Sequence, residues 1–399
     1  MRVVILLLLL SAHLAPAVAA QDEWRTDGWL KNLGPPMVSA GDEFGCYGIP
    51  EMEWDDDPGG VASVCRQYIE DNIAASRWGS KPVSTYTPAG LTASDHQLIA
   101  NQGFTIHGDK NGLQDSAWND SEDIPYDEWD WYNLGRRGGS LELGIADIDA
   151  LVAELDAGGL VNMYWQGRIH DAIVRHDRDV VAMLEAREDV WFTTWGEAWS
   201  YWSIERCNSP IILSLSDSTL NFTSESTTEC KAAEPMRWNV PVTWIIDVNG
   251  SEVIDVNLPE LSEEENHARE GWRIDGDRLF LSVKDDTNVL INLSEITDYD
   301  VVGRTQFFNN KTTALTIAGH STTDLFSWSK RFDDHPTLLF TWLVTPQELD
   351  SGLTWLPYAG IAIAASSVTV ILLLVRREQQ THTDAEAFMP VMQGGGDDE

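Results

Sequence analysis

Residues 41–54, GDEFGCYGIPEMEW, decide the fold that this sequence predicts. The short apolar run FGCYG at 44–48 is expected to form a strand, and the glycine-rich bend sets Tyr47 and Glu51 four residues apart. Four residues is a spacing at which two side chains of one loop can hold a metal ion. From residue 59 to 76 the apolar positions recur at helical spacing. The sequence therefore predicts a strand, a ligand-type loop and a helix.

The alternation of strands and helices continues to about residue 205. Further strands are expected at 82–88, 104–108, 160–165 and 190–195, and further helices at 94–103, 145–159 and 179–189. In the helix at 94–103, Ser94 is the expected N-cap and Gly103 the expected stop signal. Strands that alternate with helices are typical of a parallel sheet. Residues 21–205 are therefore predicted to form an α/β domain, either a layered sheet or a barrel.

After Cys207 the pattern changes to short, β-rich segments. Turn residues separate some of them, as at Asn249-Gly250 and Asp275-Gly276. This pattern favours an all-β sandwich over residues 206–346. The expected strands lie at 241–248, 252–258, 278–284, 288–294, 313–319 and 337–344.

Both ends of the chain carry membrane signals. A positive residue, a short leucine-rich run and small residues follow one another in residues 1–20, the order of a secretory signal peptide. Residues 353–375 hold no charge, and a helix of that length spans roughly 34 Å, enough to cross a bilayer. Arg376 and Arg377 follow at once, and positive residues favour the cytoplasmic side. The sequence predicts a single-pass type I protein of the cell membrane, with extracellular N-terminal domains and a cytoplasmic tail at 376–399.

Four cysteines suit an oxidising, extracellular compartment. They permit three pairings, of which local pairing joins Cys46 to Cys65 and Cys207 to Cys230 and gives each domain one bridge. No C-x-x-C pair is present, which argues against a cysteine zinc site. Five N-x-S/T triplets mark possible glycosylation sites in this compartment. They begin at Asn119, Asn221, Asn249, Asn292 and Asn310.

The formal charge of −38, from 64 acidic and 26 basic residues, limits the partners of this surface. Such a surface repels nucleic-acid phosphates and anionic lipids, so no nucleic-acid partner is expected. It suits a salty medium or divalent cations. With 43% hydrophobic residues, the chain still has enough apolar side chains to build packed cores.

The loop at 41–54 belongs to a longer series of segments that resembles the polysaccharide deacetylase family. The other segments are KPVSTYTPAGLTASDHQLIANQGFTIHGD at 81–109 and EDVWFTTWGEAWSYW at 188–202. In order, they are similar to the family's G-H-E-x-G-x-H-G-x-x-H loop, its R-x-P-x-G strand end with the next helix and GF strand, and its closing aromatic segment. The resemblance covers about residues 38–203. It implies an incomplete deacetylase-type (β/α) barrel, followed here by the sandwich and one transmembrane helix.

The family's catalytic residues are an Asp pair, two histidines four apart, an Arg and a late His, which hold a metal ion and hydrolyse N-acetyl groups on polysaccharide. The histidine positions fall here on Tyr47 and Glu51, and the Arg position falls on Tyr86. The late His position falls on Trp165 or Gln166, and no strand with an Asp pair precedes the loop. A neutral tyrosine is a poor zinc ligand. The resemblance therefore implies a degenerate, non-catalytic relative without a cofactor, which binds or scaffolds surface glycan.

An active enzyme is an alternative interpretation. A rebuilt metal site could draw on Asp42, Glu51, His107 and Asp109, with His170 near the late-histidine position. It would need zinc or another divalent metal, and the chain would then be a polysaccharide deacetylase that hydrolyses carbon–nitrogen amide bonds. A third interpretation is a structural envelope component whose sandwich packs against an envelope protein partner.

Aromatic residues indicate which ligand the former site could hold. The chain has 18 Trp, and Trp54, Trp165 and Trp195 are expected near that site. Flat apolar rings with polar edges stack well against the faces of sugars, although most buried tryptophans only pack a core. These three residues are the predicted glycan contacts, and carbohydrate is the predicted partner.

Overall fold

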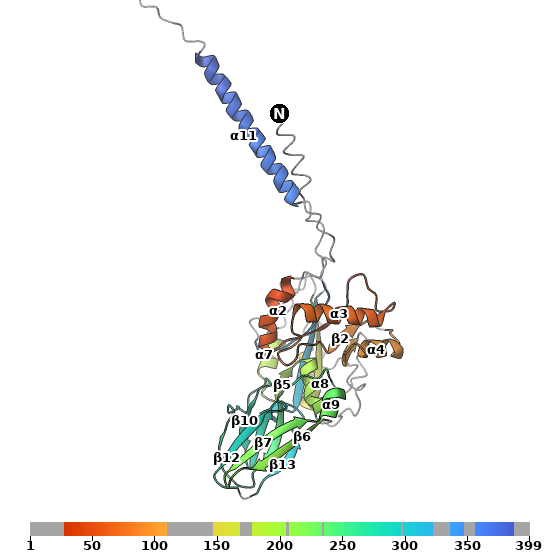
Figure 1. Ribbon diagram of the computed structural model, residues 1–399, viewed down its shortest axis with the longest axis vertical. Coiled ribbons are helices and arrows are strands. Elements are labelled where there is room, and N and C mark those ends of the chain that lie inside the picture. The colour runs from red at the N-terminus through yellow and green to blue at the C-terminus, as the bar shows by residue number, and fades with distance from the viewer. Residues whose placement is uncertain are drawn as a thin grey trace, which may run out of the picture. The chain divides into compact units, whose positions relative to one another are not determined.

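The structure is a computed structural model, and its elements are drawn in Figure 1. It describes residues 28–88, 90–109, 147–167, 178–204, 207–233, 235–296, 298–321, 336–346 and 356–386. The chain divides into two compact units, Met1–Gln347 and Glu348–Glu399. Four predicted features lie outside the described residues: the signal peptide, the sequon at Asn119, His170 and the end of the tail from 387 to 399.

A seven-stranded parallel sheet, curled into a half-barrel, organises the first unit. Its strand order is β3-β2-β1-β15-β14-β4, and β5 also pairs with β14. The predicted α/β class with a parallel sheet is therefore confirmed. The strands are β1 (Glu43–Cys46), β2 (Ser84–Thr87), β3 (Ile106–Asp109), β4 (Gly159–Gly167), β5 (Val190–Thr193), β14 (Thr313–Ser321) and β15 (Thr341–Val344).

Two central strands of this sheet come from the end of the unit. β15 pairs in parallel with β1, where Thr341 lies opposite Glu43, and β14 pairs with both β15 and β4. The sequence pattern predicts these segments, 313–319 and 337–344, in the sandwich; the structure places them in the parallel sheet instead. Both are almost continuously apolar, which is typical of parallel strands that are buried on both faces. β15 is therefore the strand that lies beside β1 on the side opposite β2.

The helices predicted at 59–76, 94–103, 145–159 and 179–189 are present with shorter bounds, whereas those at Gly28–Ala40 and Trp195–Ser203 were not predicted. In α3 the Asp57 side chain accepts a hydrogen bond from the Gly60 N–H, and Pro58 occupies the first turn. α4 begins with a capping box of Thr92 and Asp95, so the predicted N-cap, Ser94, lies inside the helix. The described helices are α2 (Gly28–Ala40), α3 (Pro58–Asn72), α4 (Ala93–Ala100), α6 (Ile148–Ala157), α7 (Arg178–Glu185) and α8 (Trp195–Ser203).

Helix α8 is buried along its whole length. It follows β5 directly and lies against β3 and β14. The Trp195 N–H at its start donates to Thr341 Oγ1 at 3.0 Å. The predicted closing aromatic segment thus becomes a core helix that is anchored to β15.

Between α8 and β14 the chain inserts two four-stranded antiparallel sheets. Their orders are β10-β11-β8-β13 and β6-β7-β12-β9. Phe222 and Trp244, one from each sheet, have ring centroids 6.2 Å apart, so the buried faces pack together. The elements are β6 (Asn208–Ser214), β7 (Thr219–Ser226), α9 (Thr228–Ala233), β8 (Val242–Asp247), β9 (Val253–Val256), β10 (Gly271–Asp275), β11 (Arg278–Val283), β12 (Asn288–Leu293), β13 (Asp300–Arg304) and the 3-10 turn η4 (Phe308–Asn310).

Both predicted disulfides are confirmed. Cys46, at the end of β1, is bonded to Cys65 on α3, and their Cα atoms are 6.0 Å apart. Cys207 is bonded to Cys230 on α9, with a Cα–Cα distance of 5.4 Å. The first bridge fixes α3 to the strand that carries the Gly41–Trp54 loop, and the second fixes α9 to the start of β6.

The second unit contains one helix that is long and apolar enough to cross a membrane, among the residues that the structure describes. This helix, α11, covers Leu356–Glu386, and its apolar window is Gly360–Arg377. The predicted span at 353–375 therefore falls on a helix that continues past Arg376 and Arg377. The disulfides and this helix are compatible with a membrane-anchored extracellular protein.

Candidate functional site

Four aromatic side chains meet at the carboxyl ends of the parallel strands. Tyr47 follows β1, Tyr86 lies in β2, Tyr164 in β4 and His320 in β14. The Tyr47 ring is stacked on the His320 ring at 4.6 Å and lies 5.5 Å from the Tyr86 ring, with interplanar angles of 20° and 15°. Tyr86 meets Tyr164 edge to face at 5.8 Å. These four residues are called the aromatic cluster below.

Tyr47 is the half-buried member of the aromatic cluster, whereas the other three are buried. Its backbone is held on both sides, because its N–H donates to the Val344 carbonyl at 2.9 Å and its carbonyl accepts from Trp54 Nε1 at 3.1 Å. Burial raises the pKa of the Tyr47 phenol above its usual value of 10.0. At neutral pH the phenol is therefore protonated, which suits a hydrogen-bond donor and disfavours metal coordination.

A buried polar layer supports the aromatic cluster from below. Trp195 Nε1 donates to Asn162 Oδ1 at 2.8 Å, and Thr316 Oγ1 donates to the same oxygen at 3.0 Å. The Trp195 ring packs edge to face against Tyr164 at 6.0 Å. This fixed contact from α8 holds one wall of the aromatic cluster in place.

Gly108 is required for that close packing, and Gly108→Ala tests it. A Cβ atom at this position would lie 2.6 Å from both Trp195 Cη2 and Tyr164 Oη. We expect the substitution to lower the free energy of unfolding by about 2 kcal/mol, because both rings must move. Gly59→Ala is the matched control, since its Cβ would meet Leu98 at an ordinary 3.6 Å. Urea unfolding measures both variants, and equal midpoints for the two would contradict the packing described here.

Two fully buried carboxylates lie at the start of α8: Glu197 belongs to its first turn, and Glu43 of β1 is bonded to it. Glu43 accepts hydrogen bonds from Ser84 Oγ and from the Gly196 N–H at 2.7 Å, and burial raises its pKa. Burial also raises the pKa of Glu197 to about 7, although the Arg77 guanidinium opposes this shift. Arg77 Nη2 lies 3.9 Å from Glu197 Oε1, beyond hydrogen-bond distance. The interior of the first unit therefore holds two acids whose pKa values are raised above the usual value of a glutamate.

The residues that the deacetylase resemblance assigns to the ligand and arginine positions are only partly brought together. Tyr47 and Tyr86 are neighbours, as the family's spacing implies. Glu51 is exposed in the bend, with a φ of 63°, and is not part of the aromatic cluster. Gln166 lies opposite His320 in the β4–β14 register.

The residues of the rebuilt metal site have other partners. Both carboxylate oxygens of Asp42 are occupied, by the Phe340 N–H at 2.9 Å and by Trp342 Nε1 at 3.0 Å. His107 is hydrogen-bonded to Thr87 and packs against His96 of α4 at 4.6 Å. Among the described residues, no group of three His, Cys, Asp or Glu side chains is placed to hold a metal ion. Asp109 ends β3, and His170 is outside the described residues.

The three predicted glycan contacts lie in or near the core. Trp165 is 1% exposed and packs edge to face against Trp342, and Trp195 is 0% exposed beneath Tyr164. Trp54 is 7% exposed, and its Nε1 donates a hydrogen bond to the Tyr47 carbonyl. The indole rings therefore support the site from within, and Tyr47 is the ring that reaches the surface.

Sequence reasoning did not find Tyr164 or His320. His320 ends the apolar run TALTIAGH. Because the sequence pattern places that run in the sandwich, it does not predict His320 at the site. Tyr164 lies in a correctly predicted strand, at a position that alternates with the buried Met163 and Trp165. A polar aromatic residue near the carboxyl end of a parallel strand is the signal that could have identified both.

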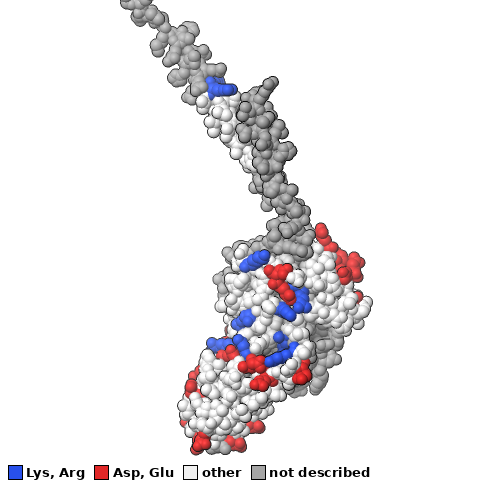
Figure 2. All heavy atoms as spheres, in the orientation of Figure 1, with Lys and Arg blue, Asp and Glu red and all other residues white. Residues whose placement is uncertain are grey.

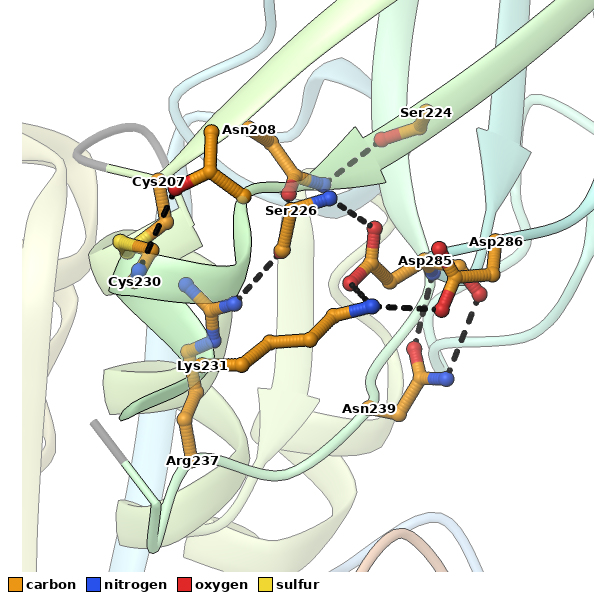
Figure 3. A network of polar contacts seen from close by, with 11 residues as sticks. Cys207, Asn208, Ser224, Ser226, Cys230, Lys231, Arg237, Asn239, Asp285 and Asp286 are labelled. Atoms are coloured by element: carbon orange, nitrogen blue, oxygen red, sulfur yellow. Dashed lines mark hydrogen bonds and ion pairs between the residues drawn. A yellow bond between two sulfur atoms is a disulfide. The ribbon is translucent and has the colours of Figure 1, made fainter. Parts of the chain in front are cut away.

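A second polar cluster connects α9 to the antiparallel sheets (Figure 3). Lys231 Nζ lies 2.7 Å from Asp286 and 3.6 Å from Asp285. The Ser226 N–H donates to Asp285 Oδ1 at 2.8 Å, and the Asn239 side chain accepts from the Asp285 N–H at 2.8 Å. Because these groups form hydrogen bonds and ion pairs with one another, the cluster joins α9 to the antiparallel sheets and has a structural role.

The described sequons lie in the antiparallel part. Asn249 has a φ of 46° in a turn with Gly250, as predicted, and the exposed Asn310 has a φ of 62°. Asn221 lies in β7 and Asn292 in β12. Their glycosylation stays a prediction.

Comparison of the chain with protein-family models, with curated proteins and with solved structures finds no match. The deacetylase resemblance therefore stays a prediction from the sequence. The geometry of the aromatic cluster is the basis on which a function is inferred.

Proposed function

We propose that this chain is a membrane-anchored cell-surface protein that binds glycan through the aromatic cluster without hydrolysing it. The observation that carries the proposal is the half-buried Tyr47, whose ring is stacked on His320 and lies beside Tyr86. Its position supports the proposal as well, since ligands of α/β proteins bind at the carboxyl ends of parallel strands.

The chemistry of the aromatic cluster suits a neutral sugar. A tyrosine ring offers an apolar face for the C–H groups of a sugar ring and a phenol that hydrogen-bonds its hydroxyls. The stack behind Tyr47 fixes the ring, so binding loses little conformational entropy. The acidic chain, at −38, disfavours phosphate-rich ligands but not uncharged polysaccharide.

The proposal includes a degenerate deacetylase-type site and a type I orientation. The half-barrel and the adjacency of Tyr47 and Tyr86 fit the positions that the resemblance assigns to a histidine and an arginine. Fold likeness alone does not carry activity, so the ligand class rests on the site. The basic pair Arg376-Arg377 at the end of the apolar window supports a cytoplasmic tail.

Glycan titration of the full-length chain in detergent tests this function. With N-acetylated chito-oligosaccharide as the probe, Tyr47→Ala is expected to weaken binding by at least about tenfold, since the stacking surface is lost. Tyr47→Phe keeps the ring and is expected to stay within about threefold of the parent chain. Tyr299→Ala, a half-buried tyrosine of the antiparallel part, is the matched control.

Three outcomes would contradict the proposal in different ways. Release of acetate from the probe would favour the hydrolase interpretation, with a metal site built from residues other than those described. Binding that Tyr47→Ala leaves unchanged would place the glycan elsewhere. Absence of binding to acetylated and deacetylated oligosaccharides alike would favour a structural envelope component.

A further inference from the structure

One face of the antiparallel part is apolar and open. It is the outer face of the sheet β6-β7-β12-β9, where the register sets Leu213 beside Asn221, and Asn221 beside Leu290. In the next row Ile211 lies beside Thr223. Leu213 is 55% exposed, Ile211 is 41% exposed and Leu290 is 40% exposed. The name uncharged face is used below for six residues, which are Ile211, Leu213, Asn221, Thr223, Asn288 and Leu290.

Two polar groups of the uncharged face bond to each other, whereas Asn221 Oδ1, near its centre, is buried without a hydrogen-bond partner among the described residues. Thr223 Oγ1 donates to Asn288 Oδ1 at 2.7 Å. Four residues further along the same two strands, beyond the Asn221–Leu290 pair, Thr219 Oγ1 donates to Asn292 Oδ1 at 3.1 Å. Because these bonds are made within the sheet, a partner can cover the face without leaving those groups unpaired.

The position of the charges decides which partner fits. The chain carries −38, so two copies repel each other wherever acidic surfaces meet. On this sheet the nearest carboxylates are at its margins, Glu225 opposite Ser209 at one end and Asp255 on the edge strand β9. Figure 2 shows the surface over β7 and β12 as mostly uncharged, with acidic side chains at the rim. Two copies can therefore approach face to face here with their acidic side chains kept apart.

The edge of the same sheet is less suited to association. β6 is an edge strand, and Pro210 within it lacks a backbone N–H donor. Proline on an edge strand opposes the addition of a further strand. Contact through side chains of the face is therefore favoured over extension of the sheet.

We propose that the uncharged face is the contact between two copies of this chain. A symmetric dimer uses the same patch on both subunits, and an uncharged patch of aliphatic side chains is complementary to itself. The two sheets would stack about 10 Å apart, as the sheets of a sandwich do. The contact is independent of the aromatic cluster, which lies on the parallel sheet.

The mass of the full-length chain in detergent, measured by sedimentation over a range of concentrations, tests the dimer. The parent chain is expected to dimerise, and added salt should strengthen the dimer because it screens the acidic surfaces. Leu213→Lys with Leu290→Lys should raise the dissociation constant at least tenfold. Ile274→Lys is the matched control, because Ile274 is 41% exposed on the other sheet, and it should change nothing.

Two results would overturn the dimer. The first is a parent chain that stays monomeric. A dimer that survives the double substitution counts equally, because it would then depend on another surface such as α11. The second is a glycan on Asn221 of monomeric chain, found by intact mass, because the sequon at this position would then cover the face itself. Folding of each variant is confirmed by circular dichroism, and an unfolded double variant is replaced by Leu290→Asn alone, for which a weaker dimer is again expected.

Discussion

A chain that ends at residue 205, the boundary that the sequence favours for the first domain, is expected not to fold. In the strand order β3-β2-β1-β15-β14-β4, the two strands at the centre come from 313–344. Without them β1 and its neighbours have no sheet contact with β4, and β5 loses its partner β14. The expected loss is therefore the whole cooperative transition of the α/β unit.

The truncated chain also loses buried polar contacts. Glu43 would lack Thr341, and the start of α8 would lack the hydroxyl that its Trp195 N–H donates to. Unpaired buried groups of this kind cost about 1–3 kcal/mol each. Near-ultraviolet circular dichroism and urea titration of the chains ending at 205 and at 346 make the comparison. A cooperative unfolding transition in the shorter chain would show that the first domain is autonomous, contrary to the strand order.

Replacement of Glu197 by Gln is expected to flatten the pH dependence of stability. The folded protein raises the pKa of Glu197 from 4.5 to about 7, chiefly through burial. Between those values the folded state keeps a proton that the unfolded state releases. The contribution of this group to stability is therefore complete below about pH 4.5, falls as the pH rises, and is constant above about pH 7.

The size of this effect follows from the width of the pH window. About 2.5 pH units at roughly 1.4 kcal/mol each correspond to about 3 kcal/mol. The difference in unfolding free energy between Glu197→Gln and the parent chain should thus grow by about 3 kcal/mol from pH 4 to pH 8, in favour of the variant. Glu43 stays in both chains and, because its charge is one cause of the raised pKa of Glu197, the difference reports the two coupled acids together. Glu252→Gln, at an exposed position, is the control, and parallel pH profiles for the parent and Glu197→Gln would contradict the assignment.

Local patterns predict the elements of the first unit but not the membership of its sheet. The apolar period after Asp57 correctly predicts α3, and the short runs around Tyr86 and Tyr164 correctly predict β2 and β4. A run such as TALTIAG shows a strand, yet nothing within it says whether its partner is parallel or antiparallel. Pairing of Ala318 with Tyr164 joins residues far apart in the chain, and only the folded structure gives that information.

The candidate site was predictable where a local motif defined it. Tyr47 and Tyr86 follow from the loop and strand end that carry the deacetylase resemblance, and they are neighbours at 5.5 Å. His320 could not be placed, because its strand enters the sheet after the antiparallel insertion. Trp165 and Trp195 are buried, a distinction that composition cannot make, since an indole ring suits a core and a sugar-binding surface equally.

The most direct test of glycan binding by the aromatic cluster is a chito-oligosaccharide titration of the full-length chain followed through its histidine ring resonances by NMR. His320 is assigned from the signal that His320→Gln removes. We predict that the His320 signal shifts to saturation as the sugar stacks on Tyr47, while the signals of His96 and His267, which pack elsewhere, stay in place. A His320 signal that does not move at saturating sugar would contradict the proposal.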